Sequence, residues 1–298
     1  MVKDATTDSE LPPESPPESP TMRTYVPKAP LSEFVEQFWY WKHRSPRCLE
    51  RILPWGTFEF VIRLGNDRTE IIHPGKLGQT EVFSGALLTG PQTRSFVLDK
   101  SQQDELIGIH FRPGGAFPFF GMPANEFLDR HVSLESVCRA DAEELRERLE
   151  LAPLLPSKFQ ILESWLVARL NGVRARHQAV RYSLERLTQA ERLTQTSSQE
   201  SIVRMKDLAD EVNLSTRRLS ELFSREVGLA PKVFARLQRF QHALRCLEAN
   251  KSPDFSEVAL KCGYFDQSHF NHEFLEFSSL TPTLYLEKTT GHLGHVRV

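Results

Sequence analysis

The same helical pattern occurs twice in the C-terminal third of the chain, over residues 205–223 and again over residues 255–274. Each copy reads as a short helix with apolar periodicity, then a tight turn and a second helix. The first helix of each copy holds an alanine, Ala209 or Ala259, where a larger side chain would force two crossing helices apart. The pattern predicts two helix-turn-helix units, a layout whose second helix is shaped to enter the major groove of DNA.

The turns and caps occupy matching positions in the two copies. Asn213 and Gly263 begin the turns, and both residue types tolerate a positive φ. Ser215 and Asp266 follow as predicted N-caps, and the carboxylate of Asp266 also complements the helix dipole. Apolar residues at helical spacing form the predicted inward stripes: Leu219, Leu222 and Phe223 in the first unit, and Phe270, Phe274 and Phe277 in the second.

The side chains left on the outward faces of the two second helices can hydrogen-bond base edges or phosphates. We expect these helices to enter successive major grooves about one helical turn apart. Base reading is predicted for Thr216, Arg217, Ser220 and Glu221 in the first unit and for Gln267, Ser268, Asn271 and His272 in the second. Phosphate contact or packing is predicted for Arg218, Arg225, Arg236 and Arg239.

Between the two copies, Pro231 begins a predicted helix that runs to about Leu247. The whole region resembles the DNA-binding domain of the AraC/XylS transcription regulators, in which one long helix joins two helix-turn-helix units. The matching residues are 208–223, 228–231, 236–244 and 258–282. The resemblance implies a sequence-specific transcription regulator whose partner is double-stranded DNA, with RNA polymerase, a small-molecule effector and a second copy of the chain as further partners. Activation and repression both stay open.

The second unit departs from the family pattern where it ends. The family usually has a basic residue right after the last phenylalanine of the recognition helix, and a glycine shortly before the closing Ser/Thr-Pro. This chain has Leu275-Glu276 and Ser279 there. The missing cation removes a phosphate contact, and Glu276 repels the DNA backbone mildly. We therefore expect the first unit, which keeps Arg225, to carry more of the electrostatic affinity.

Charge and composition bound the remaining classes. The chain has 37 Lys and Arg against 39 Asp and Glu, so the strongly basic footprint usual for nucleic-acid binding is absent and modest affinity is expected. No apolar run approaches the roughly 20 residues that span a bilayer, and the N-terminus lacks a secretory signal, so a cytoplasmic location without membrane contact is expected. The four cysteines, Cys48, Cys138, Cys246 and Cys262, form no C-x-x-C pair, which argues against a zinc site and favours packing roles for the last two.

The sequence predicts an α+β, multidomain fold with a β-rich, cupin-like barrel or sandwich ahead of the all-α DNA-binding domain. An amphipathic helix is expected within the β-rich part, over residues 32–41. The predicted divisions are a disordered Pro-rich tail 1–23, the β-rich domain 24–130, a helical connecting region 131–193, a linker 194–200, the DNA-binding domain 201–288 and a tail 289–298. For the helical region, core packing within one chain and a dimer contact both stay open.

Residues 108–121 resemble a segment in the N-terminal domains of some AraC-type regulators, which implies a sensory or dimerising role. If they converge inside a barrel, the charged residues Glu59, Arg63, Arg94 and Arg112 predict a small anionic effector; otherwise they are solvated faces or ion pairs. The predicted strands offer His73 and His110 but no H-x-H pair, so no metal, no cofactor and no enzymatic activity are expected. An enzyme built on the barrel and a protein-interaction module that has lost DNA contact remain the alternatives.

Overall fold

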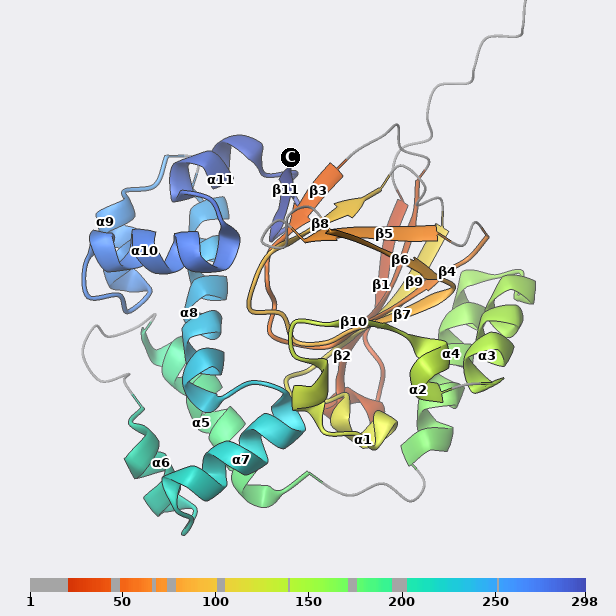
Figure 1. Cartoon of the computed structure of the whole chain (residues 1–298), viewed down its shortest axis with the longest axis horizontal. Helices are drawn as coiled ribbons and strands as arrows, with labels where there is room; N and C mark the ends of the chain where they lie inside the picture. Colours follow the sequence, from red (N-terminus) through yellow and green to blue (C-terminus); the bar gives the residue numbers. More distant parts are fainter. Residues whose placement is uncertain are drawn as a thin grey trace, which may run out of the picture.

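The computed structural model describes residues 21–43, 49–65, 68–73, 79–100, 105–138, 140–170, 176–194, 203–250 and 252–298. Two antiparallel sheets face each other in one part of the molecule, and a bundle of helices lies beside them (Figure 1). The predicted α+β, multidomain fold class is confirmed. Within the described residues, every helix is too short or too polar to cross a membrane.

The two sheets form a β-domain whose strands all pair in antiparallel fashion. The first sheet has the order β1 (Thr21–Tyr25), β2 (Val35–Lys42), β9 (Glu105–Phe111), β4 (Glu59–Arg63), β7 (Ala86–Thr89) and β10 (His131–Ser133). The second has the order β11 (His295–Arg297), β3 (Leu49–Ile52), β8 (Phe96–Asp99), β5 (Arg68–His73) and β6 (Gln79–Ser84).

Short helices cover the outer face of the first sheet. They are η1 (Leu31–Glu33), α1 (Phe117–Phe120), η2 (Ala124–Phe127), α2 (Leu134–Cys138), α3 (Ala140–Leu151) and α4 (Leu155–Leu170). Phe60 of β4 stacks on Trp165 of α4 with ring centroids 5.6 Å apart. Alternate residues of β4 point the other way, so Glu59, Val61 and Arg63 face the space between the sheets. The β-domain therefore has an aromatic core on one side of this sheet and a cavity on the other.

The helical domain is built around one long helix, α8 (Pro231–Glu248). Around it lie α5 (Gln178–Thr194), α6 (Met205–Glu211), α7 (Thr216–Val227), α9 (Phe255–Lys261), α10 (Gln267–Ser278) and α11 (Pro282–Lys288). Phe234, Leu237 and Phe240 of α8 are fully buried in this core. Val180 and Leu184 of α5 join the same core, whereas α3 and α4 pack on the β-domain. The buried apolar residues of the predicted connecting region 131–193 are thus divided between two cores, while Leu151 and Leu154 stay exposed.

The end of the chain joins the helical domain to the β-domain. Strand β11 pairs with β3, and Figure 1 shows it beside β3 at the edge of the second sheet. The backbone N–H of Leu53 donates to the carbonyl of Gly294 at 2.9 Å. Ser95 Oγ donates to the carbonyl of Ser278 in α10 at 3.1 Å. Because these bonds cross between the domains, the helical domain is seated on the β-domain.

Several sequence predictions about boundaries are wrong. The predicted helix 32–41 is the 3-10 helix η1 followed by strand β2. Phe38 packs on the outer face of that strand and Trp39 faces the cavity, so both faces carry aromatic residues and no polar alternation reveals the strand. The predicted tail 1–23 overlaps β1, and the predicted tail 289–298 contains β11. Residues 1–20 and residues 195–200 of the predicted linker lie outside the described residues.

Candidate nucleic-acid interface

The two helix-turn-helix units have the same turn geometry. In the first, Asn213 has φ 54° and the N–H of Leu214 donates to the carbonyl of Ala209 at 3.0 Å. In the second, Gly263 has φ 74° and the N–H of Tyr264 donates to the carbonyl of Ala259 at 2.9 Å. The turn predicted for each copy is confirmed, and the two turns close with equivalent backbone hydrogen bonds.

The predicted caps and inward stripes are also confirmed. Ser215 Oγ accepts from the N–H of Arg218 at 3.2 Å, and the Asp266 carboxylate accepts from the N–H of His269 at 2.7 Å. Ala209 and Ala259 are buried where the helices cross, as are all six residues of the predicted stripes. Each recognition helix, α7 and α10, is therefore held by its apolar face and leaves its polar face available.

The polar face of α7 carries a small group of charged side chains. Thr216, Arg217, Arg218, Glu221 and Arg225 are exposed and Ser220 is half-buried. The Arg217 side chain is 90% exposed, and its Nε donates to Glu221 at 3.0 Å. This hydrogen bond is the main cause that lowers the pKa of Glu221, and Arg218 adds to it. Exposed pairs of this kind contribute little free energy, so a phosphate or a base can replace Glu221 as the partner of Arg217.

The polar face of α10 carries uncharged donors and acceptors and a histidine. Gln267, Ser268, Asn271 and His272 are all exposed, as the sequence predicted. Gln267 Oε1 accepts from Ser256 Oγ of α9 at 2.8 Å, which positions the first of these side chains. The second unit can thus read base edges, but its face has less positive charge than that of α7.

Arg236 and Arg239 form ion pairs with α10. Both belong to α8, their side chains are 28% and 26% exposed, and both donate to Glu273 of α10, at 2.8 Å and 3.0 Å between the nearest atoms. Arg236 also pairs with Glu276. Of the two roles predicted for these arginines, phosphate contact or packing, the geometry favours packing. Sequence reasoning missed Glu273, although its position three residues after Phe270 places it on the inward face of α10.

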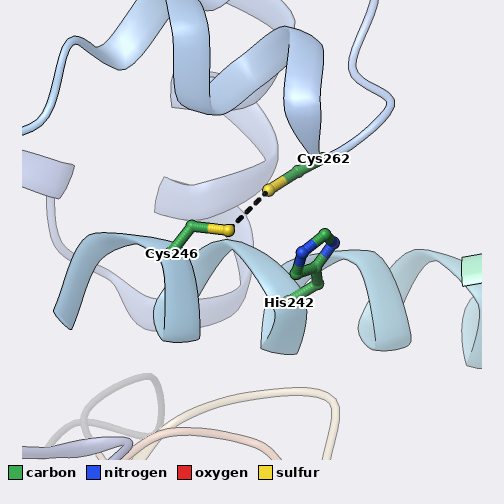
Figure 2. Close-up of side chains that lie close together, drawn as sticks. All are labelled: His242, Cys246 and Cys262. Carbon is green, nitrogen blue, oxygen red and sulfur yellow. Dashed lines mark hydrogen bonds between the residues drawn. The ribbon is translucent and has the colours of Figure 1, made fainter. Parts of the chain in front are cut away.

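A second cluster that sequence reasoning missed lies between α8 and α9. Figure 2 shows His242 and Cys246 on α8 and Cys262 at the end of α9. Cys262 Sγ donates to Cys246 Sγ at 3.8 Å, and this contact is the main cause that lowers the pKa of the Cys246 thiol, with His242 adding to it. The sequence signal was the four-residue spacing of His242 and Cys246, which puts both on one helix face.

A cavity of about 520 Å³ lies between the two sheets of the β-domain. Glu59 and Arg63, two of the four charged residues singled out in the sequence, line it. Arg94 is exposed outside it, and Arg112 donates to the carbonyl of Ser32 at the surface, so two of the four charged residues do not converge inside the barrel. Arg94 and Arg112 both lie outside the strands whose side chains face the cavity.

The cavity combines an apolar wall with a few charged groups. Trp39, Trp41 and Trp55 line it, and so do Lys100 and His110. Arg63 is almost fully buried and its Nε donates to Thr69 Oγ1 at 3.0 Å. The chain segment 291–295 completes the wall, so residues that follow the DNA-binding helices form part of the cavity in the β-domain.

Two helix-turn-helix units joined by one long helix define a double helix-turn-helix DNA-binding domain, here joined to a β-domain with an internal cavity. Residues 208–288 match the family described as "Helix-turn-helix domain", and residues 23–133 match "Domain of unknown function (DUF6597)". The C-terminal domain is of the AraC/XylS type, which confirms the resemblance seen in the sequence.

The chain is also similar to curated relatives and to solved structures. The transcriptional activator RhaR of Yersinia pseudotuberculosis serotype O:1b (strain IP 31758) is 27% identical over 131 residues, which are 43% of this chain and 43% of that relative. The chain thus matches less than half the length of this relative. ToxT of Vibrio cholerae is 11% identical, with 91% of this chain and 98% of that chain covered and a TM-score of 0.42. The DNA-binding domain of AdpA, solved with a target DNA, is 23% identical, with 36% and 90% covered and a TM-score of 0.31.

Proposed function

We propose that this chain is a transcription regulator that reads two successive major-groove segments of double-stranded DNA through α7 and α10. The observation that carries the proposal is the equivalent hydrogen bond that closes each turn, between Leu214 and Ala209 and between Tyr264 and Ala259. With both recognition helices presented in the same way and joined by one rigid helix, two grooves about one turn apart can be read together.

The polar side chains divide the work of binding. Arg217, Ser220 and Glu221 read bases from α7, with Thr216 beside them, while Arg218 and Arg225 contact phosphates. Gln267, Ser268, Asn271 and His272 read bases from α10. Arg236 and Arg239 hold α10 against α8 instead of binding DNA. Because the formal net charge is only -2 and the positive charge gathers on α7, the first unit provides most of the electrostatic affinity.

The cavity in the β-domain binds the effector. Its three tryptophans suit the apolar face of a small molecule, while Arg63 suits a carboxylate or another acidic group. Glu59 in the same wall accepts hydrogen bonds from hydroxyl or amine groups. A small organic acid that also carries hydroxyl groups therefore fits the lining better than a purely apolar ligand. A ligand in the cavity would contact residues 291–295, and this contact would connect the effector to the DNA-binding domain.

Selection of bound duplexes from a random library tests DNA recognition. We expect an enriched motif with two conserved blocks about 10 bp apart, and binding that weakens as salt rises. The matched pair of variants is Arg217→Ala on α7 and Arg148→Ala, which removes an exposed arginine from α3, a helix that packs on the β-domain. Only the first should relax the preference at one base. A library without enrichment would contradict the proposal.

Calorimetry against small organic acids tests the cavity. Arg63→Ala should abolish the heat of binding, and Arg112→Ala should leave it unchanged because Arg112 lies outside the cavity. The second candidate function is a protein-interaction module, which the exposed Phe265 and Leu275 of the second unit favour. Enrichment of a DNA motif would rule out that module as a replacement for DNA binding.

A further inference from the structure

His242, Cys246 and Cys262 bring three metal-binding groups together inside the DNA-binding domain, where neither base reading nor effector binding uses them. One ligand atom from each residue lies within 4.8 Å of those of the other two. His242 and Cys246 stand one helical turn apart on α8, and Cys262 is the C-cap residue directly after α9 (Figure 2). His242 is 4% exposed and Cys262 is 2% exposed, whereas Cys246 is half-buried and provides access from one side.

The distance between the two sulfurs matches a shared metal ion. Two thiolates that bind one Zn²⁺ at a bond length of about 2.3 Å and a tetrahedral angle lie about 3.8 Å apart. The Sγ atoms of Cys246 and Cys262 are 3.8 Å apart. A disulfide bond has a length of about 2.05 Å, so the two sulfurs would have to move toward each other to form one. The spacing therefore suits an intervening ion without rearrangement of the helices.

The histidine provides an independent indication of a ligand. Among the described residues, His242 Nδ1 is buried and has no hydrogen-bond partner. A buried ring nitrogen without a partner carries a desolvation cost, which coordination of a metal ion would offset. Two sulfurs and one imidazole nitrogen are the donors that thiophilic ions prefer, and oxygen-seeking ions such as Mg²⁺ and Ca²⁺ are disfavoured by such a set.

We propose that His242, Cys246 and Cys262 form a binding site for a thiophilic metal ion with a filled d shell, Zn²⁺ or Cu⁺. The three protein ligands leave a fourth position of a Zn²⁺ ion open on the side of Cys246, while Cu⁺ is served by the same two sulfurs and nitrogen. Binding of Zn²⁺ releases the protons of the two thiols, since the thiolate is the ligand.

The site would act on the second recognition helix. Cys262 immediately precedes Gly263, the residue with φ 74° that begins the turn before α10. A metal ion bound to both Cys262 and the two α8 ligands would fix the end of α9, and with it this turn, against the long helix. Metal binding would thereby stiffen the second helix-turn-helix unit without touching the DNA-facing side chains.

Metal binding by the reduced full-length chain tests the proposal. Titration with Co²⁺ should produce a thiolate-to-metal charge-transfer band that saturates at one ion per chain, and competition against a chromophoric chelator should give the affinities for Zn²⁺ and for Cu⁺. Loss of an outer-shell partner costs roughly 10- to 100-fold in metal affinity, so Cys246→Ser should weaken binding by at least about 100-fold. The matched control replaces the other two cysteines, as C48S/C138S, and should bind like the original chain.

Three results would overturn the proposal. One is equal metal affinity in Cys246→Ser and in the original chain. Another is loss of binding in C48S/C138S alone. The third is a chain that takes up neither ion under reducing conditions but forms a Cys246–Cys262 disulfide on mild oxidation. Since a variant at a buried position can unfold, X-ray absorption of the Zn²⁺-loaded original chain gives a second measurement, in which two sulfurs and one nitrogen are expected and a shell of oxygen and nitrogen alone contradicts the site. These measurements involve no DNA, so they stand apart from the proposed regulatory function.

Discussion

Replacement of Glu273 by Gln should destabilise the helical domain more than any other conservative change on α10. Glu273 is 3% exposed, and its carboxylate accepts from Arg236 Nε at 2.8 Å and from Arg239 Nη2 at 3.0 Å. A glutamine keeps one acceptor oxygen but turns its NH₂ group toward the guanidinium groups. Both arginines then lose their charged partner on α10 while they remain largely covered by it.

The size of the effect follows from the burial of the three side chains. Removal of one partner from a buried ion pair costs about 3–5 kcal/mol. The two arginine side chains are 28% and 26% exposed, and Arg236 keeps its contact with Glu276, so water and a second carboxylate reduce the loss. We therefore expect Glu273→Gln to lower the free energy of unfolding by about 2–3 kcal/mol. Glu276→Gln, at an exposed position of the same helix, should cost less than about 1 kcal/mol.

Urea unfolding followed by two probes can assign the loss to the right domain. All four tryptophans, Trp39, Trp41, Trp55 and Trp165, belong to the β-domain and its helices, so their fluorescence reports that part. Helical circular dichroism also reports the C-terminal domain, and Glu273→Gln should shift this transition more than the fluorescence transition. A double-mutant cycle with Arg239→Gln should give a coupling energy of about 1–3 kcal/mol. If Glu273→Gln costs no more than Glu276→Gln, or if the cycle is additive, the reasoning is refuted.

Three further predictions concern the ion pairs of Glu50, base reading by Arg217 and the C-cap of α7 at Gly228. Burial alone would raise the pKa of Glu50, but hydrogen bonds from His295 and Lys100 lower it to about 2, so its stabilisation is present above pH 4.5 and is lost as pH falls toward 2. Glu50→Gln should thus lower the free energy of unfolding by up to about 3 kcal/mol at pH 6. If the difference in free energy of unfolding between the variant and the original chain is as large at pH 3 as at pH 6, the ionised Glu50 carboxylate is not its source. Arg217→Ala should weaken binding to the selected duplex by about 1–3 kcal/mol and relax one base, measured by gel shift; a uniform loss over all sequences would argue against base reading. Gly228→Ala should lower the melting temperature, because φ is 91° there and a Cβ would meet Pro91 of the β-domain at 2.7 Å, and an unchanged melting temperature would show that this contact yields freely.

Local signals in the sequence predicted the helical domain closely. The helix expected from Pro231 to about Leu247 is found as Pro231–Glu248, because proline at the first position and apolar periodicity mark both its start and its inner face. The caps at Ser215 and Asp266 act on backbone groups only a few residues away, so their partners could be inferred from spacing alone. Features that depend on contacts within one or two helical turns were therefore accessible.

Features that depend on distant partners were not accessible from one sequence. Strand β11 exists because it pairs with β3 at the other end of the chain, with Val296 opposite Arg51. The carboxylate of Glu273 has a role only because α8 brings two arginines to it, and no local pattern connects the three. The cysteines were assigned to packing for the same reason, since the separation of Cys246 and Cys262 in sequence hides the 3.8 Å between their sulfurs.

The contacts of the C-terminal segment explain how a ligand in the β-domain could act on DNA binding under the proposed function. His292 and His295 line the cavity, and α11, which precedes them, places Tyr285 against Phe274 of α10 with ring centroids 5.7 Å apart. Tyr285 also donates to Glu248 at the end of α8. A ligand shifts such an arrangement only if it binds more tightly to one position of the segment than to another. The effector must therefore contact residues 291–295 themselves, since a molecule held by the sheets alone would bind equally well whether or not β11 stays paired with β3.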